Sequence, residues 1–308
     1  MRARVGWLAA LLAAAGTGLW LARPAPPGWP PGLGGLLVYV SDASGEDALY
    51  CRRLPDGEDR RLTHFVEPVS DPSLSPDGRQ VAFAMEGRIA VVSLDSPRVR
   101  FLTVGVDWKD SAPTWRSDAK ALVVASRRPG ALFSDVHLLT PTGDGDEVTR
   151  TPLTETPGLD EQSPVFVSGD RALIFVREDS LYRLELKDAR PRRIAGGFRK
   201  YRAPCVLPSG RVLVLWNEGK LYGIDVLDPD GRNRETLSEG TICYRNLAPS
   251  PDGRFLAATF SFDLAFHPRE ALRLRQREEV RLLDARGRAL APLLASWRTT
   301  FHSPAWSR

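Results

Sequence analysis

The chain has 308 residues, of which 25 are proline and 26 are glycine, and its formal net charge is +4. Arg2, Arg4 and Arg23 account for three of the excess positive charges, so the rest of the chain is close to neutral. A nucleic-acid binder needs a basic face, so this charge balance argues against that class. The length suits one large domain, and the proline and glycine content suits a fold with many turns.

Residues 1–23 place Arg2 and Arg4 before an apolar run from Val5 to Ala22. This run is just long enough for a helix to span a bilayer. We expect one N-terminal hydrophobic helix that serves as a signal anchor in the inner membrane, with its arginines on the cytoplasmic side. The alternative is a signal peptide cut after small residues such as Ala13 to Ala15, which would release the protein to the periplasm. Both interpretations place the rest of the chain in the cell envelope, on the periplasmic or extracellular side.

Residues 24–34 read Pro-Ala-Pro-Pro-Gly-Trp-Pro-Pro-Gly-Leu-Gly. Such a stretch favours polyproline geometry, and we expect a semi-rigid linker there. From residue 35 to residue 308 the pattern is β throughout. Short segments of alternating apolar residues, such as Leu36 to Val40 and Val81 to Met85, are separated by turn residues.

One motif organises this region. Asp71-Pro72-Ser73-Leu74 precedes the turn Ser75-Pro76-Asp77-Gly78, and Ser250-Pro251-Asp252-Gly253 repeats that turn. Proline, aspartate and glycine each favour a tight turn for a different reason, through a preset φ, a local hydrogen bond and a positive φ. When the repeats are aligned on the first proline, the copies begin at Pro72, Pro113, Pro164, Pro204, Leu247 and Pro304. A period of about 40–45 residues with insertions is typical of a propeller.

The two ends of the chain complete each other. The first unit has three strands and lacks an innermost strand, whereas the chain ends on one isolated strand, Ser303-Pro304-Ala305-Trp306-Ser307-Arg308. Pairing the last strand with the first three would leave no open edge at that point. The prediction is an all-β, six-bladed β-propeller over residues 35–308, closed by its C-terminal strand and preceded by the hydrophobic helix.

These motifs resemble a known family. The Ser-Pro-Asp-Gly turn, the Pro-x-Trp of Pro113-Thr114-Trp115 and Pro304-Ala305-Trp306, and the Arg-x-Leu-Thr outer strand resemble the WD-repeat-like units of the TolB propeller family. The resemblance covers residues 35–308 and implies the propeller fold. TolB carries an N-terminal α/β domain before its propeller, and this sequence has no room for one between Gly32 and Leu36.

The sequence lacks the common catalytic and metal-binding motifs. The sequence contains no Gly-x-Ser-x-Gly, His-Glu-x-x-His, P-loop or Cys-x-x-Cys, so we predict no metal and no cofactor. The cysteines are Cys51, Cys205 and Cys243. Cys205 and Cys243 fall in neighbouring repeats and could pair in an oxidising compartment, and buried free thiols are the alternative.

The candidate binding residues come from the start of each innermost strand. The residue two before each aligned position is polar in all six repeats, and equivalent positions should surround one mouth of the central channel. Three successive blades present Tyr201-Arg202, Tyr244-Arg245 and Phe301-His302, and aromatic residues beside arginine are typical of interface hot spots. The long segment from Asp263 to Glu279 should open on the same face and add Arg273, with a short helix beginning near Pro268.

Two functions follow. The first is a non-catalytic, exported propeller that binds a protein or peptide partner, with an acidic segment as the candidate ligand for Tyr201, Arg202, Tyr244, Arg245, Phe301, His302 and Arg273. The second is a lyase or hydrolase that works at the channel mouth through Asp110, Glu161, His302 or a tyrosine. Neither interpretation involves nucleic acid, and a partner in the membrane beside the anchor is a variant of the first.

Overall fold

The structure is a computed structural model that describes residues 29–96, 98–104, 107–142, 148–188, 190–263, 276–294 and 301–307. The side chains of residues 262, 263, 276, 277, 301 and 302 are outside this description. Met1–Leu33 and Gly34–Arg308 form two separate units. The predicted anchor and residues 24–28 of the linker lie outside the described residues. Within the described part of the chain, no helix combines the length and apolar character needed to cross a membrane.

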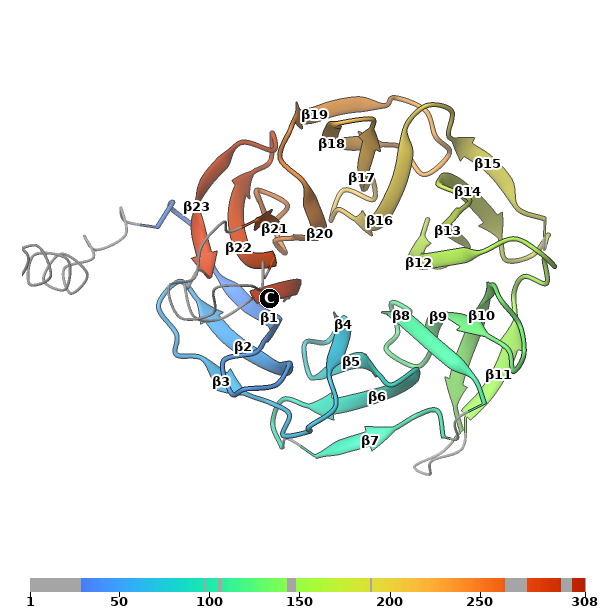
Figure 1. The fold of residues 1–308 in the computed structure, drawn as a ribbon, viewed down its shortest axis with the longest axis horizontal. Helices are drawn as coiled ribbons and strands as arrows, with labels where there is room; N and C mark the ends of the chain where they lie inside the picture. Colours follow the sequence, from blue (N-terminus) through green and yellow to red (C-terminus); the bar gives the residue numbers. More distant parts are fainter. Residues whose placement is uncertain are drawn as a thin grey trace, which may run out of the picture. The chain divides into compact units, whose positions relative to one another are not determined.

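The second unit consists of six four-stranded antiparallel sheets, the blades, around a central channel (Figure 1). From the channel outward, blades 1 to 3 contain β24 (Phe301–Ser307), β1 (Gly35–Ser41), β2 (Ala48–Leu54) and β3 (Arg60–Arg61); β4 (Val69–Leu74), β5 (Gln80–Met85), β6 (Arg88–Ser93) and β7 (Val99–Phe101); and β8 (Lys109–Trp115), β9 (Leu122–Arg127), β10 (Ser134–Pro141) and β11 (Val148–Pro152).

In the same direction, blades 4 to 6 contain β12 (Glu161–Val167), β13 (Ala172–Arg177), β14 (Ser180–Glu185) and β15 (Arg192–Ala195); β16 (Lys200–Val206), β17 (Val212–Glu218), β18 (Leu221–Leu227) and β19 (Glu235–Gly240); and β20 (Tyr244–Pro249), β21 (Phe255–Asp263), β22 (Gln276–Asp284) and β23 (Ala289–Leu294). The predicted six-bladed, all-β fold is confirmed. β22 begins at Gln276, so residues 276–279 extend a hairpin that the sequence analysis assigned to a loop. Residues 264–275, where the short helix was expected, lie outside the described residues.

The ring closes as predicted. β24 pairs with β1 in antiparallel register, with Trp306 opposite Leu37 and Ala305 opposite Val38. The indole Nε1 of Trp306 also donates a hydrogen bond of 3.0 Å to the carbonyl oxygen of Gly34. The C-terminal strand therefore supplies the innermost strand of blade 1 and covers the edge of β1.

The Ser-Pro-Asp-Gly turn is held by its own side chains. The Ser75 hydroxyl donates to Asp77 at 2.6 Å and accepts from the backbone N–H of Gln80 at 2.9 Å, while Gly78 has φ +68°. Ser250 makes the same contacts with Asp252 and with the N–H of Phe255. Because the hydroxyl caps the start of the second strand, the turn sets the register of the hairpin between the two inner strands.

The Leu-Thr pairs at the outer strands also have one structural role. The hydroxyl oxygens of three buried threonines each accept a hydrogen bond of 2.8–2.9 Å from a third-strand N–H, in the pairs Thr63–Leu49, Thr103–Ile89 and Thr154–Val136. The leucine before each threonine is buried, or nearly so, and its N–H bonds to the carbonyl of the same third-strand residue. The outer strand is thereby continued by a side-chain hydrogen bond at the point where it leaves the sheet.

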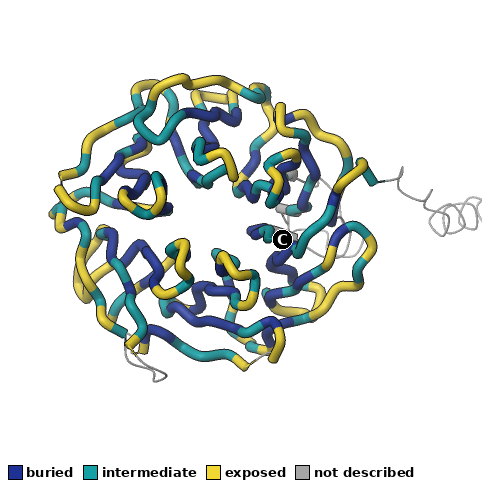
Figure 2. The backbone as a smooth tube through the Cα atoms, turned by 180° about the vertical axis from the view of Figure 1, so that it is seen from behind, coloured by how far each residue is buried: buried dark blue, intermediate teal, exposed yellow. Residues whose placement is uncertain are grey.

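The core lies between the blades. Clusters of buried aliphatic and aromatic side chains join adjacent sheets, for example Val38, Leu49 and Val81 with Phe83 across blades 1 and 2. Figure 2 shows the buried backbone within the blades and the exposed backbone in the turns between strands. Each blade buries both faces against its neighbours, which explains why its second and third strands read as continuous apolar runs.

Candidate functional site

The channel has a narrow ring formed by the aligned repeat position. In every blade the innermost strand carries a one-residue β-bulge. In blade 2, for example, Ser70 pairs with Ala84 and Ser73 pairs with Ala82, so the innermost strand has one residue more than its partner between these pairs. In five blades the residue before the aligned proline has φ between 47° and 50°, and these residues are Asp71, Ala112, Ser163, Ala203 and Ser303. Proline cannot donate to the sheet ladder, so a bulge is where an inner strand accommodates it.

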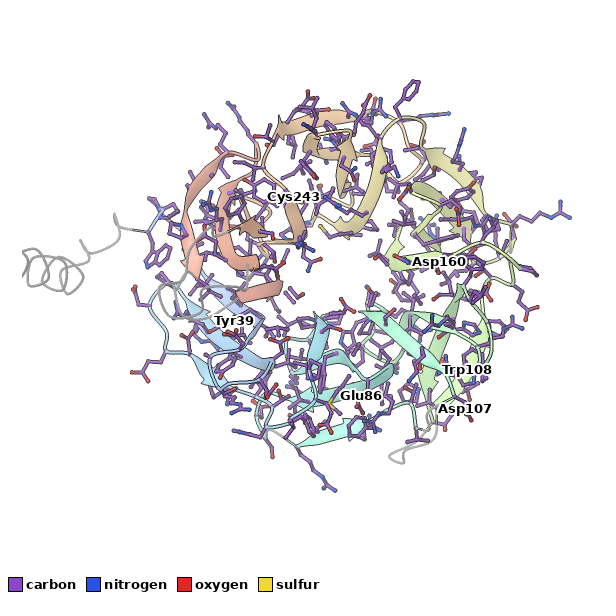
Figure 3. The ribbon with its side chains drawn as sticks, viewed as in Figure 1. Tyr39, Glu86, Asp107, Trp108, Asp160 and Cys243 are labelled. Atoms are coloured by element: carbon purple, nitrogen blue, oxygen red, sulfur yellow. The ribbon has the colours of Figure 1, made fainter. Side chains whose placement is uncertain are left out.

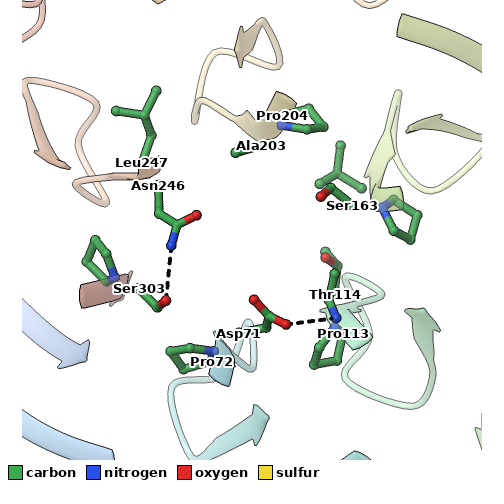
Figure 4. Close-up of a pocket in the computed structure, with 14 residues that line it drawn as sticks. Asp71, Pro72, Pro113, Thr114, Ser163, Ala203, Pro204, Asn246, Leu247 and Ser303 are labelled. Atoms are coloured by element: carbon green, nitrogen blue, oxygen red, sulfur yellow. Dashed lines mark hydrogen bonds between the residues drawn. The ribbon is translucent and has the colours of Figure 1, made fainter. Parts of the chain in front are cut away.

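The ring encloses about 140 Å³ and is lined by the bulges of all six blades (Figure 4). Its polar groups bond around the ring. The backbone N–H of Ala112 donates to Asp71 Oδ2 at 3.4 Å, and Asn246 Nδ2 donates to Ser303 Oγ at 3.0 Å. Asn246 stands in the blade where leucine replaces the aligned proline. These two hydrogen bonds link blade 2 to blade 3 and blade 6 to blade 1.

Residues on the channel side and the blade side alternate along each innermost strand. Two positions before the aligned residue, Ser111, Gln162 and Arg245 are exposed, and Ser70 and Arg202 are partly exposed. One position earlier, every described residue is buried, and these are Val69, Asp110, Glu161, Tyr201 and Tyr244. Successive side chains on a strand point to opposite faces, so only the first set faces the channel.

The two tyrosines are therefore not presented to a partner, and that part of the prediction is wrong. Tyr201 is 1% exposed, and its hydroxyl accepts a hydrogen bond of 2.9 Å from Arg234 and lies 3.3 Å from Asp225. Burial raises the pKa of Tyr201. Tyr244 is 5% exposed and packs against Phe260 with ring centroids 6.3 Å apart. Their large apolar area favours the space between blades over the channel wall.

The two arginines lie on the channel side. Arg245 is exposed, and its Nε pairs with Glu278 at 2.8 Å. Arg202 lies 3.5 Å from both Cys243 Sγ and the carbonyl oxygen of Tyr244, and its buried Nε has no hydrogen-bond partner among the described residues. Phe301 and His302 occupy the start of β24, but their side chains are outside the described part of the chain, as is Arg273 altogether.

All three cysteines are free thiols, so Cys205 and Cys243 do not pair in this structure. Burial raises the pKa of Cys205 to about 12, which keeps this thiol protonated. Figure 3 labels Cys243 at the inner part of blades 5 and 6.

Asp110 and Glu161, the two acidic residues proposed for an enzymatic role, form buried ion pairs. Asp110, 2% exposed, receives a hydrogen bond of 2.7 Å from Arg150 and one of 2.6 Å from Ser126. Arg150 also stacks over Trp108, whose position beside β11 is labelled in Figure 3. Glu161, fully buried, pairs with Arg177 and accepts from Thr154 and Thr156. A buried carboxylate must be compensated in this way, and neither residue opens to the channel.

A feature that the sequence analysis missed is the distribution of exposed apolar side chains. Two kinds of connection lie on one side of the propeller: those from the outermost strand of a blade to the innermost strand of the next blade, and those between the second and third strands of a blade. We call this side the crossover face. Seven of the nine exposed large apolar residues among those described lie in its loops or, for Leu221, at the strand end next to a loop: Val66, Val104, Leu132, Phe133, Phe198, Leu221 and Ile242. The exceptions are Leu186 and Leu290. The pattern was not apparent in the sequence because these residues are single letters in six unrelated loops.

The fold and the repeated bulge define this unit as a six-bladed β-propeller, and the comparisons with known proteins agree. No protein-family model matches the sequence. Over 150 residues the chain is 27% identical to the protein TolB homolog of Chlorobium chlorochromatii (strain CaD3), which covers 46% of this chain and 31% of the relative. The chain thus spans less than a third of that relative in the matched region, and the predicted resemblance to TolB-like propellers is confirmed.

Solved structures show the same fold in proteins of different kinds. TolB from Acinetobacter baumannii has a TM-score of 0.71 at 16% identity over 88% of this chain and 66% of its own. A nidogen/laminin complex chain reaches 0.67 at 11% identity over 90% and 99%. An oligogalacturonate lyase in complex with manganese has a TM-score of 0.57 at 14% identity over 83% of this chain and 73% of its own. At such identities the likeness concerns the fold.

Proposed function

We propose that this protein is a non-catalytic propeller of the cell envelope that binds a protein or peptide through its crossover face. The single observation that carries this proposal is the concentration of exposed apolar side chains on that face. Phe198 is 88% exposed, Leu132 79% and Val104 76%. Exposed apolar side chains gathered on one face mark an interaction surface, since isolated ones would be distributed over both faces.

The similarity to TolB and to a chain of the nidogen/laminin complex supports binding, and the N-terminal apolar run supports an envelope location with a membrane anchor. Arg202 and Arg245 at the channel mouth remain the proposed contacts for an acidic segment, together with Phe301, His302 and Arg273. The alternative, an enzyme with an activity like that of the oligogalacturonate lyase, would work through Asp110, Glu161, His302 or a tyrosine, and of these Asp110 and Glu161 are each paired with an arginine.

Site-specific crosslinking tests the proposal. A photo-reactive amino acid is placed at Val104 or Phe198 on the crossover face and, as the matched control, at Leu186 on the opposite face. All three positions are exposed, so the fold should tolerate the change. In cells that produce the full chain, we expect one discrete protein adduct from the two crossover positions and none from Leu186.

Equal adducts from both faces, or none from the crossover face, would contradict the proposal. Arg245→Glu refines it, because reversing this exposed charge should reduce the adduct if the partner segment is acidic. Release of unsaturated sugar from oligogalacturonate by the purified protein would instead favour the enzyme.

A further inference from the structure

A cavity of about 310 Å³ opens on the crossover face between blades 2 and 3. Its walls come from the hairpin at Glu86 and Gly87, from the start of β8 at Lys109 and Ser111, and from Arg127. Ala84 and Met85, both buried, line it as apolar groups. Figure 3 labels Glu86 on this hairpin. We call this cavity the blade 2–3 pocket.

Two cations meet in the pocket without a counter-ion. Lys109 and Arg127 are direct partners in the register of β8 and β9, so their side chains leave the sheet on the same side. The side chain of Arg127 makes no hydrogen bond or ion pair with any residue that the structure describes. Among the described residues, Lys109 Nζ donates a hydrogen bond to the Glu86 carbonyl oxygen alone, at 3.4 Å. Like charges placed opposite each other repel, and an anion between them would remove that repulsion.

Two carboxylates, those of Glu86 and Asp110, belong to the lining of the pocket, but they do not supply this anion. The Glu86 carboxylate pairs with Arg88 at 2.9 Å, and Asp110 is held by Arg150. Hydroxyl groups complete the lining, since Ser70, Ser111 and Ser134 all border the pocket. Ser134 stands opposite Arg127 on β10, so Lys109, Arg127 and Ser134 form one row across three strands.

We propose that the blade 2–3 pocket binds a carboxylate group carried on a short aliphatic stem, as in an acidic side chain or the C-terminus of a peptide. The planar guanidinium of Arg127 can take both carboxylate oxygens, and Lys109 adds a point charge beside it. The apolar surface of Met85 and Ala84 packs against the stem. The inference rests on the proposed function, and it adds a contact for an acidic partner beside blades 2 and 3, separate from the contacts proposed at Arg202 and Arg245.

Calorimetric titration of the full chain tests this pocket. The probe is the tripeptide acetyl-Gly-Gly-Glu-amide, which has one carboxylate, and its glutamine counterpart is the control probe. Arg127→Gln and Lys109→Gln remove one cation each, and Lys187→Gln removes an exposed cation from a turn on the opposite face. Loss of a charge-assisted contact should weaken binding of the glutamate probe about tenfold in each pocket variant. Lys187→Gln should leave it unchanged, and the glutamine probe should not bind.

Equal binding of the two probes, or unchanged binding in Arg127→Gln, would overturn the proposal. Acetate gives a further comparison, because equal affinity for acetate and for the tripeptide would overturn the assignment to a stemmed carboxylate of a peptide. Both substituted side chains are exposed, so the variants should fold, and thermal melting verifies this. If the glutamate probe does not bind but crosslinking from Phe198 gives an adduct, the pocket proposal is rejected and the proposed function stands. If the probe binds but crosslinking gives no adduct, the proposed function alone is rejected.

Discussion

At the scale of single residues, buried threonine hydroxyl groups accept hydrogen bonds from backbone N–H groups of the third strands. Thr103 is 8% exposed, and its Oγ1 accepts a hydrogen bond of 2.8 Å from the N–H of Ile89. A buried N–H that loses its acceptor carries the full cost of its desolvation. The Leu-Thr pairs visible in the sequence are therefore anchors of the outer strand.

Thr103→Val keeps the shape of the side chain and removes the acceptor. We expect the free energy of unfolding to fall by about 1–3 kcal/mol, because the N–H of Ile89 is left buried and unpaired. Denaturation in urea measures this change. Thr149→Val, at an exposed position of β11, is the matched control and should stay within about 0.5 kcal/mol. Similar losses in both variants would contradict the role given to Thr103.

Ser75 has a corresponding electrostatic effect. Its hydrogen bond lowers the pKa of Asp77 below the ordinary 3.8. Because the folded-state pKa is depressed, the stability that Asp77 contributes is present above about pH 4 and is lost as the pH falls through the folded-state value. Ser75→Ala should raise the pKa of Asp77, as followed by carboxyl NMR titration. An unchanged titration would show that the hydroxyl is not the cause.

At the scale of the elements, the bulge in each innermost strand is the feature that shapes the channel. Ala112 and Ala203 adopt φ of 49° and 47° there, a region that side chains with a Cβ rarely occupy. The chain accepts this local strain in five blades, since the bulge turns the strand and places a small or polar side chain on the ring.

Ala112→Gly should relieve this strain and raise the free energy of unfolding by up to about 1 kcal/mol. The control is Ala125→Gly in the regular strand β9, where glycine should cost about 1 kcal/mol because no strain is relieved. Thermal and urea denaturation of both variants give the comparison. Destabilisation by both substitutions would argue against a strained bulge.

At the scale of the whole propeller, closure joins residues 272 positions apart in the chain, as in the bond from Trp306 to Gly34. Every blade packs on two neighbours, so the ring should unfold as one cooperative unit. An open ring would expose the edge of β1 and the faces of two blades to water and to other chains.

A chain truncated after residue 300 tests this. Without β24 we expect the melting temperature to fall by about 10 °C or more, with a broader transition and a tendency to aggregate. A peptide with the sequence of residues 301–307 should restore part of the loss by adding a strand to β1, and a scrambled peptide should not. An unchanged melting curve after truncation would refute closure as a source of stability.

The fold could be predicted from the sequence to a large extent, whereas the site could not. The turn motifs, the period near 40–45 residues and the isolated last strand indicated six blades and their closure, and all of this is confirmed. The prediction that Tyr201 and Tyr244 surround the channel was wrong, because a one-residue change in position on a strand exchanges the channel side for the core. The pairing of Asp110 with Arg150, 40 residues later, was also not visible in the sequence.

The sequence by itself determined which segments become strands and where they turn, because proline, glycine and serine act on their immediate neighbours. Only the tertiary structure decided which side chains reach a partner. The row of Lys109, Arg127 and Ser134 comes together through strand pairing within blade 3, and the apolar loops of the crossover face come together because the six blades are arranged in one ring. The physical reason is that exposure and charge pairing depend on neighbours brought close by folding, which local propensity does not encode.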